Sequence, residues 1–262
     1  MPELAEVEAY RRLAEEVVGR TVAAVVAPDA WYLKRGLTAA GAEAELTGRT
    51  VTSVRRTGKL LLLETSGDGP VLGLRFGMSG RLLVDGHAAV DNLMYASNRE
   101  LERWDRFALV FAPPRGGDLR MRDSRRLGGV ELDPAEARLG PDALAIGPAA
   151  LAALLESGAP LKARLMDQAR LAGVGNLAAD EILWRAGLDP ARPARSLSPA
   201  ERRRLHRHLR AAMADLLARG GSHTGDLMPA RQPGGVCPKD GTPLVRRTVG
   251  GRTTWSCPTH QH

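Results

Sequence analysis

The sequence has little that would fix it to a membrane or to an oxidising compartment. No apolar run approaches the roughly eighteen residues of a membrane span, and no charged-then-apolar leader is visible, so neither insertion nor secretion is expected. Two cysteines, Cys237 and Cys257, are too few for a disulfide framework and fit a reducing cytosol. The chain is therefore expected to be cytoplasmic. Its content of hydrophobic residues, 44%, is high enough for packed cores.

Lysine is also scarce, with only Lys34, Lys59, Lys162 and Lys239 among 37 basic residues. Arginine supplies positive charge elsewhere, so a lysine that persists is a candidate for a role that needs a compact ammonium or a primary amine. The alternative is that these four lysines persist by chance and have no special role. The net charge of +7 favours a polyanionic partner.

The first half of the chain has the texture of a β-sandwich. Apolar residues at helical spacing predict a helix between Glu6 and Val18, which Gly19 closes. Short runs bounded by Gly, Pro and Asp then predict strands. These runs are Thr21–Val26, Val51–Arg55, Leu60–Glu64, Val71–Phe76, Arg106–Phe111, Leu119–Arg122 and Gly129–Leu132.

After Asp133-Pro134 the texture becomes helical. The expected helices are Ala149–Ser157, Leu161–Gln168, Asn176–Ala186 and Ser198–Ala218, the last with a capping-box spacing at Ser198 and Glu201. Its arginines are either a solvated face or a DNA contact. We expect an α+β fold with an N-terminal β-sandwich domain and flanking helices (1–134), a helical domain (135–219), and a linker with a C-terminal hairpin (220–262).

Pro2 and Glu3 are candidate catalytic residues. Removal of Met1 would expose Pro2 as a secondary amine, of which about a tenth is neutral at pH 7. Such an amine can attack a sugar C1′ and hold it as an iminium ion, while Glu3 moves protons. Proline at position 2 is common, however, and by itself it carries no function.

The segment Pro2-Glu3-Leu4-Ala5-Glu6-Val7-Glu8 resembles the N-terminal signature of the formamidopyrimidine-DNA glycosylase and endonuclease VIII family, with Ala5 where proline is usual. The resemblance extends over essentially the whole chain, and it makes the first domain (1–134) the catalytic one and the second (135–219) the DNA-binding one. It implies that Lys59, at the mouth of an apolar strand, contacts phosphate beside the lesion as part of the catalytic machinery.

Two loops resemble those with which the family enters the DNA duplex. They are Gly77-Met78-Ser79-Gly80 and Arg125-Arg126-Leu127-Gly128, and the resemblance makes Met78, Arg125 and Leu127 the residues that fill the space left by an extruded base. Phenylalanine is usual at 127, and histidine is frequent at the position of Arg75. These departures leave the substrate preference open.

The most specific motif runs from Leu165-Met166-Asp167-Gln168 through Leu171-Ala172-Gly173-Val174-Gly175-Asn176 into the helix after it. It resembles the helix–two-turn–helix of the family. Gly173 and Gly175 are expected to bring backbone N–H groups to a phosphate, and Asn176 adds a side-chain amide. Lys162 is a further expected DNA contact.

The C-terminal segment has the spacing of the family's four-cysteine zinc hairpin. The ligand positions hold Cys237, Asp240, Cys257 and His260. Asp and His are legitimate zinc ligands, so one structural Zn²⁺ is predicted, and a metal-free hairpin packed on Trp255 and Leu244 is the alternative. Arg252 matches the finger arginine that grips DNA and is tied to the second strand break.

The resemblance implies a monomeric base-excision-repair enzyme that acts on damaged double-stranded DNA held between its two lobes. It would flip out an oxidised or ring-opened base, remove it through a Schiff base at Pro2, and nick the strand by β- and δ-elimination. A DNA-binding relative without base excision and an N-terminal-proline tautomerase are the alternatives. Only residues 220–236 are available for the loop that closes over 8-oxoguanine, which favours oxidised pyrimidines, ring-opened purines or abasic sites.

Overall fold

The computed structural model describes residues 2–90, 93–94, 96–97, 99 and 101–262. The chain forms two compact units. The first holds Pro2 and residues 6–136, and the second holds residues 3–5 and 137–262. Within the described residues, no helix combines the length and the apolar character that a membrane span requires.

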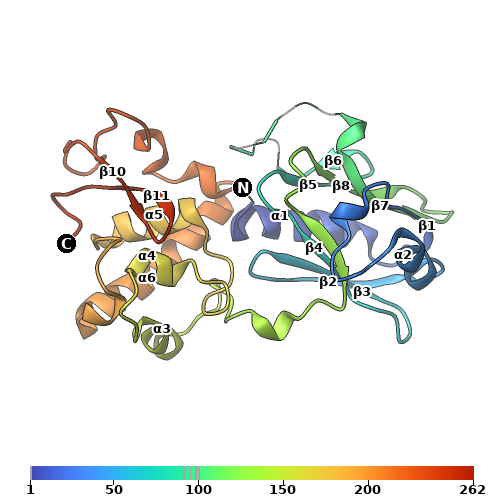
Figure 1. Ribbon diagram of the computed structural model, residues 1–262, viewed down its shortest axis with the longest axis horizontal. Coiled ribbons are helices and arrows are strands. Elements are labelled where there is room, and N and C mark those ends of the chain that lie inside the picture. Colours follow the sequence, from blue (N-terminus) through green and yellow to red (C-terminus); the bar gives the residue numbers. More distant parts are fainter. Residues whose placement is uncertain (1, 91–92, 95, 98, 100) are drawn as a thin grey trace. The chain divides into compact units, whose positions relative to one another are not determined.

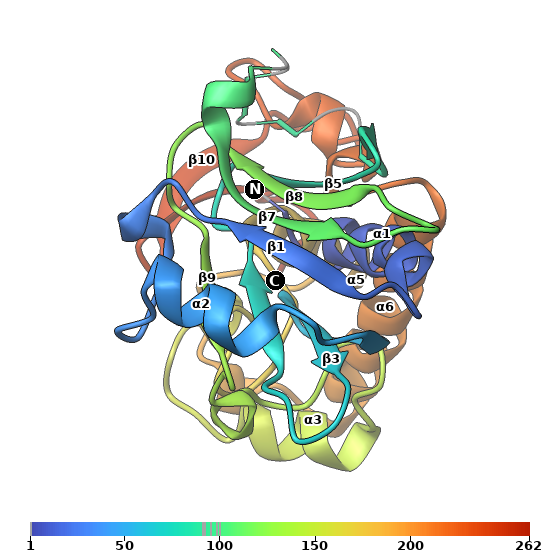
Figure 2. The ribbon, with the colours of Figure 1, turned by 90° about the vertical axis from the view of Figure 1, so that its right-hand side faces the viewer.

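The first unit is a sandwich of two antiparallel sheets, as predicted. One has the order β1-β7-β8-β5-β6 and the other β2-β3-β4-β9, and Figure 2 shows β1, β7 and β8 side by side. Apolar side chains of both sheets share one core. The strands are β1 (Val22–Val26), β2 (Val51–Thr57), β3 (Leu60–Thr65), β4 (Leu72–Arg75), β5 (Gly80–Val84), β6 (His87–Ala88), β7 (Asp105–Phe111), β8 (Asp118–Asp123) and β9 (Gly129–Leu132).

Two helices accompany this sandwich. Helix α1 (Leu4–Ala14) adds Val7 and Tyr10 to the core and is followed by a 3-10 turn, so the expected helix begins earlier and ends earlier than its pattern suggests. Helix α2 (Ala39–Leu46) was not predicted. Only Ala42 and Leu46 of its eight residues are buried, which is too few to give a helical period.

The second unit is helical. Its helices are α3 (Pro148–Leu155), α4 (Leu161–Leu165), α5 (Asn176–Ala186) and α6 (Pro199–Ala218) (Figure 1). The capping box at Ser198 and Glu201 is confirmed, because each side chain bonds to the backbone of the other residue. Helix α4 ends three residues before the predicted Gln168, whose side chain instead braces the loop that follows.

A two-stranded hairpin, β10 (Val245–Val249) and β11 (Arg252–Ser256), completes the second unit. It packs against α5 and shares with it a small apolar cluster that includes Trp184, Leu244 and Trp255. The hairpin therefore belongs to the same compact unit as the helices. A separate domain over residues 220–262 stays a prediction.

Candidate functional site

The carboxylate of Glu3 is held at the N-terminus of α5. Its side chain is 1% exposed, and it accepts hydrogen bonds from the backbone N–H groups of Gly175 (3.0 Å), Leu177 (2.8 Å) and Ala178 (3.1 Å). The first turn of a helix leaves such donors without partners and carries partial positive charge, so a carboxylate is well placed there. Pro2 directly precedes this anchored residue in the chain.

The loop before α5 has the glycines that this arrangement requires. A Cβ at Gly175 would lie 2.1 Å from the Glu3 Cδ, and one at Gly173 would lie 2.3 Å from the Leu4 side chain. Gly173 also has a φ of +112°, which disfavours other residues. The expectation that the Gly175 N–H faces a phosphate is wrong, because that N–H donates to Glu3.

Asn176 begins α5 beside this loop. Its amide oxygen is buried and has no hydrogen-bond partner among the described residues. An amide oxygen only accepts hydrogen bonds, as do the oxygens of a phosphate, so this atom does not make the predicted contact, which would fall to the NH₂ group of Asn176. The predicted phosphate contact of Asn176 therefore stays a prediction.

Lys162 is not exposed, as a side chain that contacts DNA would have to be. Its side chain is fully buried, and its ammonium pairs with Asp180 at 2.7 Å. It also donates to the Thr254 hydroxyl (2.8 Å) and the Thr253 carbonyl (3.1 Å) on β11. Burial lowers the pKa of Lys162, and Asp180 opposes that shift. The expected contact with DNA is thus corrected: Lys162 joins α4 and α5 to the hairpin.

Asp180 is a site residue that the sequence did not reveal. It is fully buried on α5, and besides Lys162 it accepts from Arg231 at 2.8 Å and from the Trp255 N–H at 3.3 Å. An aspartate in the middle of a helix is ordinarily read as solvent-exposed. The only available signal was the presence of Lys162 in a lysine-poor chain.

The hairpin turn presents Arg252 to solvent at the start of β11. The turn consists of Gly250 and Gly251, which both have positive φ angles. A Cβ at Gly250 would lie 2.6 Å from the Cβ of Ala163, so the turn sits closely on α4. Together with the Lys162 contacts, this packing fixes the position of Arg252 within the second unit.

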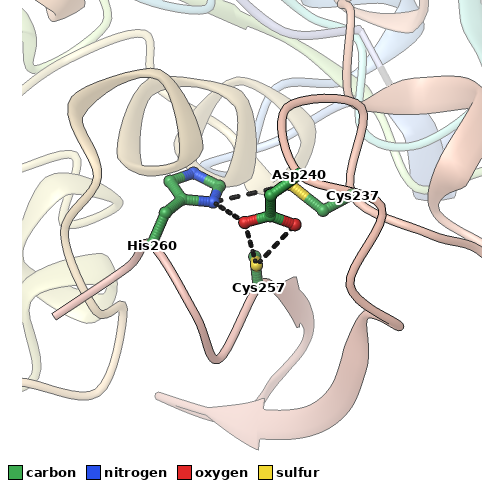
Figure 3. Close-up of side chains that lie close together, drawn as sticks. All are labelled: Cys237, Asp240, Cys257 and His260. Atoms are coloured by element: carbon green, nitrogen blue, oxygen red, sulfur yellow. Dashed lines mark hydrogen bonds and ion pairs between the residues drawn. The ribbon is translucent and has the colours of Figure 1, made fainter.

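Four side chains of the C-terminal segment converge as a candidate metal centre (Figure 3). The Cys237 Sγ lies 3.5 Å from the His260 Nδ1, which lies 3.3 Å from the Asp240 Oδ2, and that oxygen lies 3.2 Å from the Cys257 Sγ. A tetrahedral ion with the usual zinc bond lengths separates such ligand atoms by about 3.3–3.7 Å. The four donors therefore fit one metal ion.

The electrostatics of the cluster also suit a cation. Hydrogen bonds, first from the Thr242 N–H, hold the pKa of Asp240 well below its usual value. Burial raises the pKa of the Cys257 thiol in the metal-free protein. Thiolate ligands must lose their protons to bind a metal, so metal binding here is coupled to proton release.

In the first unit, the two loops expected to enter the DNA duplex, 77–80 and 125–128, lie together. A Cβ at Gly77 would lie 2.3 Å from the backbone of Leu127, and the side chain of Leu127 is 51% exposed. The buried Asp123 ties the loops by accepting from the Ser79 hydroxyl and from the N–H groups of Arg125 (3.0 Å) and Gly128 (2.8 Å). Asp123 is a second residue that sequence reasoning missed.

Met78 and Lys59 also occupy turns of the first unit. Met78 is half-buried between β4 and β5, and Lys59 is half-buried in the two-residue turn between β2 and β3. Gly58 has a φ of +59°, as a tight hairpin turn requires. Both side chains thus lie at turns and not inside a sheet, which is the placement expected of loop residues that bind a ligand.

Two family models match the chain. The formamidopyrimidine-DNA glycosylase N-terminal domain matches residues 1–130, and the H2TH domain of the same glycosylase matches residues 139–227. A formamidopyrimidine-DNA glycosylase of Thermus thermophilus is 39% identical over 285 residues, covering 100% of this chain and 98% of that protein. Its counterpart in Paracoccus denitrificans is 36% identical over 287 residues, covering 98% and 99%.

Solved structures agree over the full length. The Lactococcus lactis Fpg protein in a complex with abasic-site DNA is 26% identical, with a TM-score of 0.82 and 99% of each chain covered. A complex of the same protein with THF-DNA and an inhibitor has a TM-score of 0.83 at 26% identity, with 100% of each chain covered. The similarity therefore includes both units and the C-terminal hairpin.

Proposed function

The chain belongs to the formamidopyrimidine-DNA glycosylase family, and we propose that it is a base-excision DNA glycosylase that also cleaves the abasic strand. Its substrate is damaged double-stranded DNA, on which it acts as a monomer. The relatives are named formamidopyrimidine-DNA glycosylases, which supports the glycosylase step, and one solved neighbour holds abasic-site DNA. The basic net charge of +7 suits this partner.

The reaction begins at the secondary amine of Pro2 once Met1 is removed. The Pro2 nitrogen bonds to C1′ as the glycosidic C1′–N bond breaks, and the base leaves with a proton. Opening of the C1′–O4′ bond then gives an iminium ion. Loss of a C2′ proton breaks the C3′–O bond and cuts the strand, and a second elimination on the 5′ side releases the sugar. Water finally hydrolyses the iminium and frees Pro2.

The placement of Glu3 carries this proposal. Its carboxylate follows the nucleophile directly and is fixed by three backbone N–H groups. A rigid carboxylate beside the reacting amine can accept and return protons without reorganising. An N-terminal proline with no such neighbour would be unremarkable.

The remaining predicted residues contact the DNA. Lys59, Asn176 and Arg252 bind phosphates, and Met78, Arg125 and Leu127 fill the gap that the flipped base leaves. Lys162 positions Arg252 indirectly, by donating hydrogen bonds to the next two residues of β11. The short segment between α6 and the hairpin favours oxidised pyrimidines, ring-opened purines or abasic sites over 8-oxoguanine.

We assign the four-residue cluster to one structural Zn²⁺. The ligands are Cys237, Asp240, Cys257 and His260, and their separations support the assignment. The ion takes no part in the chemistry. It cross-links the two ends of the C-terminal segment and so holds the hairpin that carries Arg252.

Borohydride trapping on abasic DNA tests the proposal. Reduction of the iminium should cross-link the wild-type protein to DNA, and Pro2→Gly should strongly reduce the product. The chain has only four lysines, so each competing side-chain amine can be replaced in turn. Lys34→Arg is the matched control, and its trapping should be undiminished. Undiminished trapping in Pro2→Gly would refute the assignment. No cross-link in the wild type would indicate a DNA-binding relative or a tautomerase.

A further inference from the structure

Trp184, near the C-terminal end of α5, contacts the metal cluster in two ways. Its indole N–H donates to the Cys237 Sγ at 3.3 Å, and its backbone carbonyl lies 3.1 Å from the His260 Nε2. The side chain is 5% exposed and lies in the apolar cluster that also contains both cysteines. One residue outside the ligand set therefore reaches two of the four ligands.

The contact with His260 determines which of its ring nitrogens faces the cluster. The Nδ1 points to Asp240 and to Cys237, while the Nε2 points to the Trp184 carbonyl. A carbonyl only accepts, so the Nε2 must carry the hydrogen, and the Nδ1 is left with its lone pair toward the metal position. Partners of this kind fix the tautomer and orientation of histidine ligands.

The contact with Cys237 concerns charge. Two thiolates and one carboxylate carry three negative charges, and a divalent ion neutralises two of them. The indole N–H donates to one sulfur of this anionic centre and so withdraws electron density from that ligand. The ammonium of Lys239 lies close by, 4.6 Å above the Trp184 ring and 3.0 Å from its carbonyl oxygen.

We propose that Trp184 is the positioning residue of the metal centre, holding His260 with its Nδ1 toward the metal position and donating its indole N–H to the Cys237 sulfur. The proposal rests on the metal assignment made above. Through the same two contacts, Trp184 joins the C-terminal end of α5 to the segment that carries the hairpin, while the first turn of α5 binds the Glu3 carboxylate.

Cobalt substitution gives a readout that does not depend on activity. In the Co²⁺-loaded protein, the thiolate-to-metal charge-transfer band reports the electron density on sulfur. Trp184→Phe keeps an aromatic ring and the backbone carbonyl but removes the N–H, so the band should move to longer wavelength. The Co²⁺ dissociation constant should rise about tenfold to a hundredfold, as for other outer partners of metal ligands.

Trp255→Phe is the matched control. It removes a second indole from the same apolar cluster, and no bond between that indole and a metal ligand is present in the described chain. The band of this variant should stay at the wild-type position. The band position, unlike affinity, does not depend on how much protein is folded, so a general loss of stability cannot imitate the result.

The histidine tautomer is read by ¹⁵N NMR of the Zn²⁺-loaded protein. The His260 Nε2 should carry the hydrogen and the Nδ1 should show the shift of a metal-bound nitrogen. Ligation through Nε2, or a Trp184→Phe band identical to the wild type, would overturn the inference. Failure of the wild type to bind Co²⁺ at all would instead refute the metal assignment itself.

Discussion

Glu3 has two oxygens and three backbone donors, so its replacement by an amide cannot be neutral. In Glu3→Gln the NH₂ group must face at least one backbone N–H of α5, which should cost about 1–3 kcal/mol of unfolding free energy. We also expect removal of an intact damaged base to fall far more than cleavage of a preformed abasic site. Base departure needs a proton transfer, whereas β-elimination can use water.

Activity on the two DNA substrates, with urea unfolding of the same samples, checks this prediction. The stability loss alone would lower both activities by the same factor. An equal loss on both substrates would therefore leave Glu3 with an anchoring role only.

Side-chain surroundings were the hardest part to predict from the sequence. Residue type selected Pro2, Glu3 and the four candidate metal ligands, because their chemistry is local or their spacing is specific. It did not reveal that Glu3 fills the helix N-terminus that Gly175 was expected to offer to a phosphate. Residue type also gave no indication that Lys162 is buried, because its partner Asp180 lies 18 residues away on another helix.

At the scale of elements, the N-terminus of α6 is sensitive to acid. The Arg192 guanidinium, bonded to both oxygens of Glu201, lowers the pKa of that carboxyl to about 2. A lowered pKa in the folded state gives stability that is present above the unfolded value near 4.5 and is lost as the pH falls toward 2.

Glu201→Gln should therefore destabilise the protein by about 0.5–1 kcal/mol at pH 7, and the deficit should shrink between pH 4.5 and 2.5. Urea unfolding across this range measures it. Glu156→Gln is the control, because the Glu156 carboxylate is 62% exposed in its pair with Arg202, and Glu156 ends α3 through its backbone N–H and not through its side chain. A deficit that stays constant down to pH 2.5 would contradict the assignment of the stability to the ionised cap.

Elements with explicit end signals were predicted best. The bounds of α5 agree at both ends because Gly187, in the left-handed conformation, stops it, and α6 begins at its capping box. β5 was missed although all five of its residues are buried. Its apolar run, Leu82-Leu83-Val84, is too short to separate from a loop, and pairing with β8 decides its conformation.

At the scale of the whole molecule, the metal centre should divide the protein into parts of unequal stability. The hairpin shares only a small apolar cluster, whereas the sandwich and the helices each have an extensive core. Metal supplies on the order of ten kcal/mol to the folding of finger peptides. Chelation should therefore unfold residues 236–262 and leave the rest of the chain folded.

Native mass spectrometry of gently prepared protein should find one zinc per chain, and the oxygen ligand should make it easier to remove than from a four-cysteine site. Hydrogen exchange after chelation should rise in the hairpin alone, and DNA affinity should fall about tenfold or more as Arg252 is released. A metal-free protein with full DNA affinity would show that packing around Trp255 suffices.

Helix α5 has eleven residues, so it is about 16 Å long, and each residue turns it by about 100°. Its first turn binds Glu3 and its last turn contacts two of the candidate metal ligands, Cys237 and His260. A one-residue deletion would therefore shorten the spacing by about 1.5 Å and also rotate one end away from its partners. The number of residues in α5 therefore fixes the angle about the helix axis between the Glu3 carboxylate and the C-terminal hairpin. We expect this number to stay constant even where the exposed residues of the helix change.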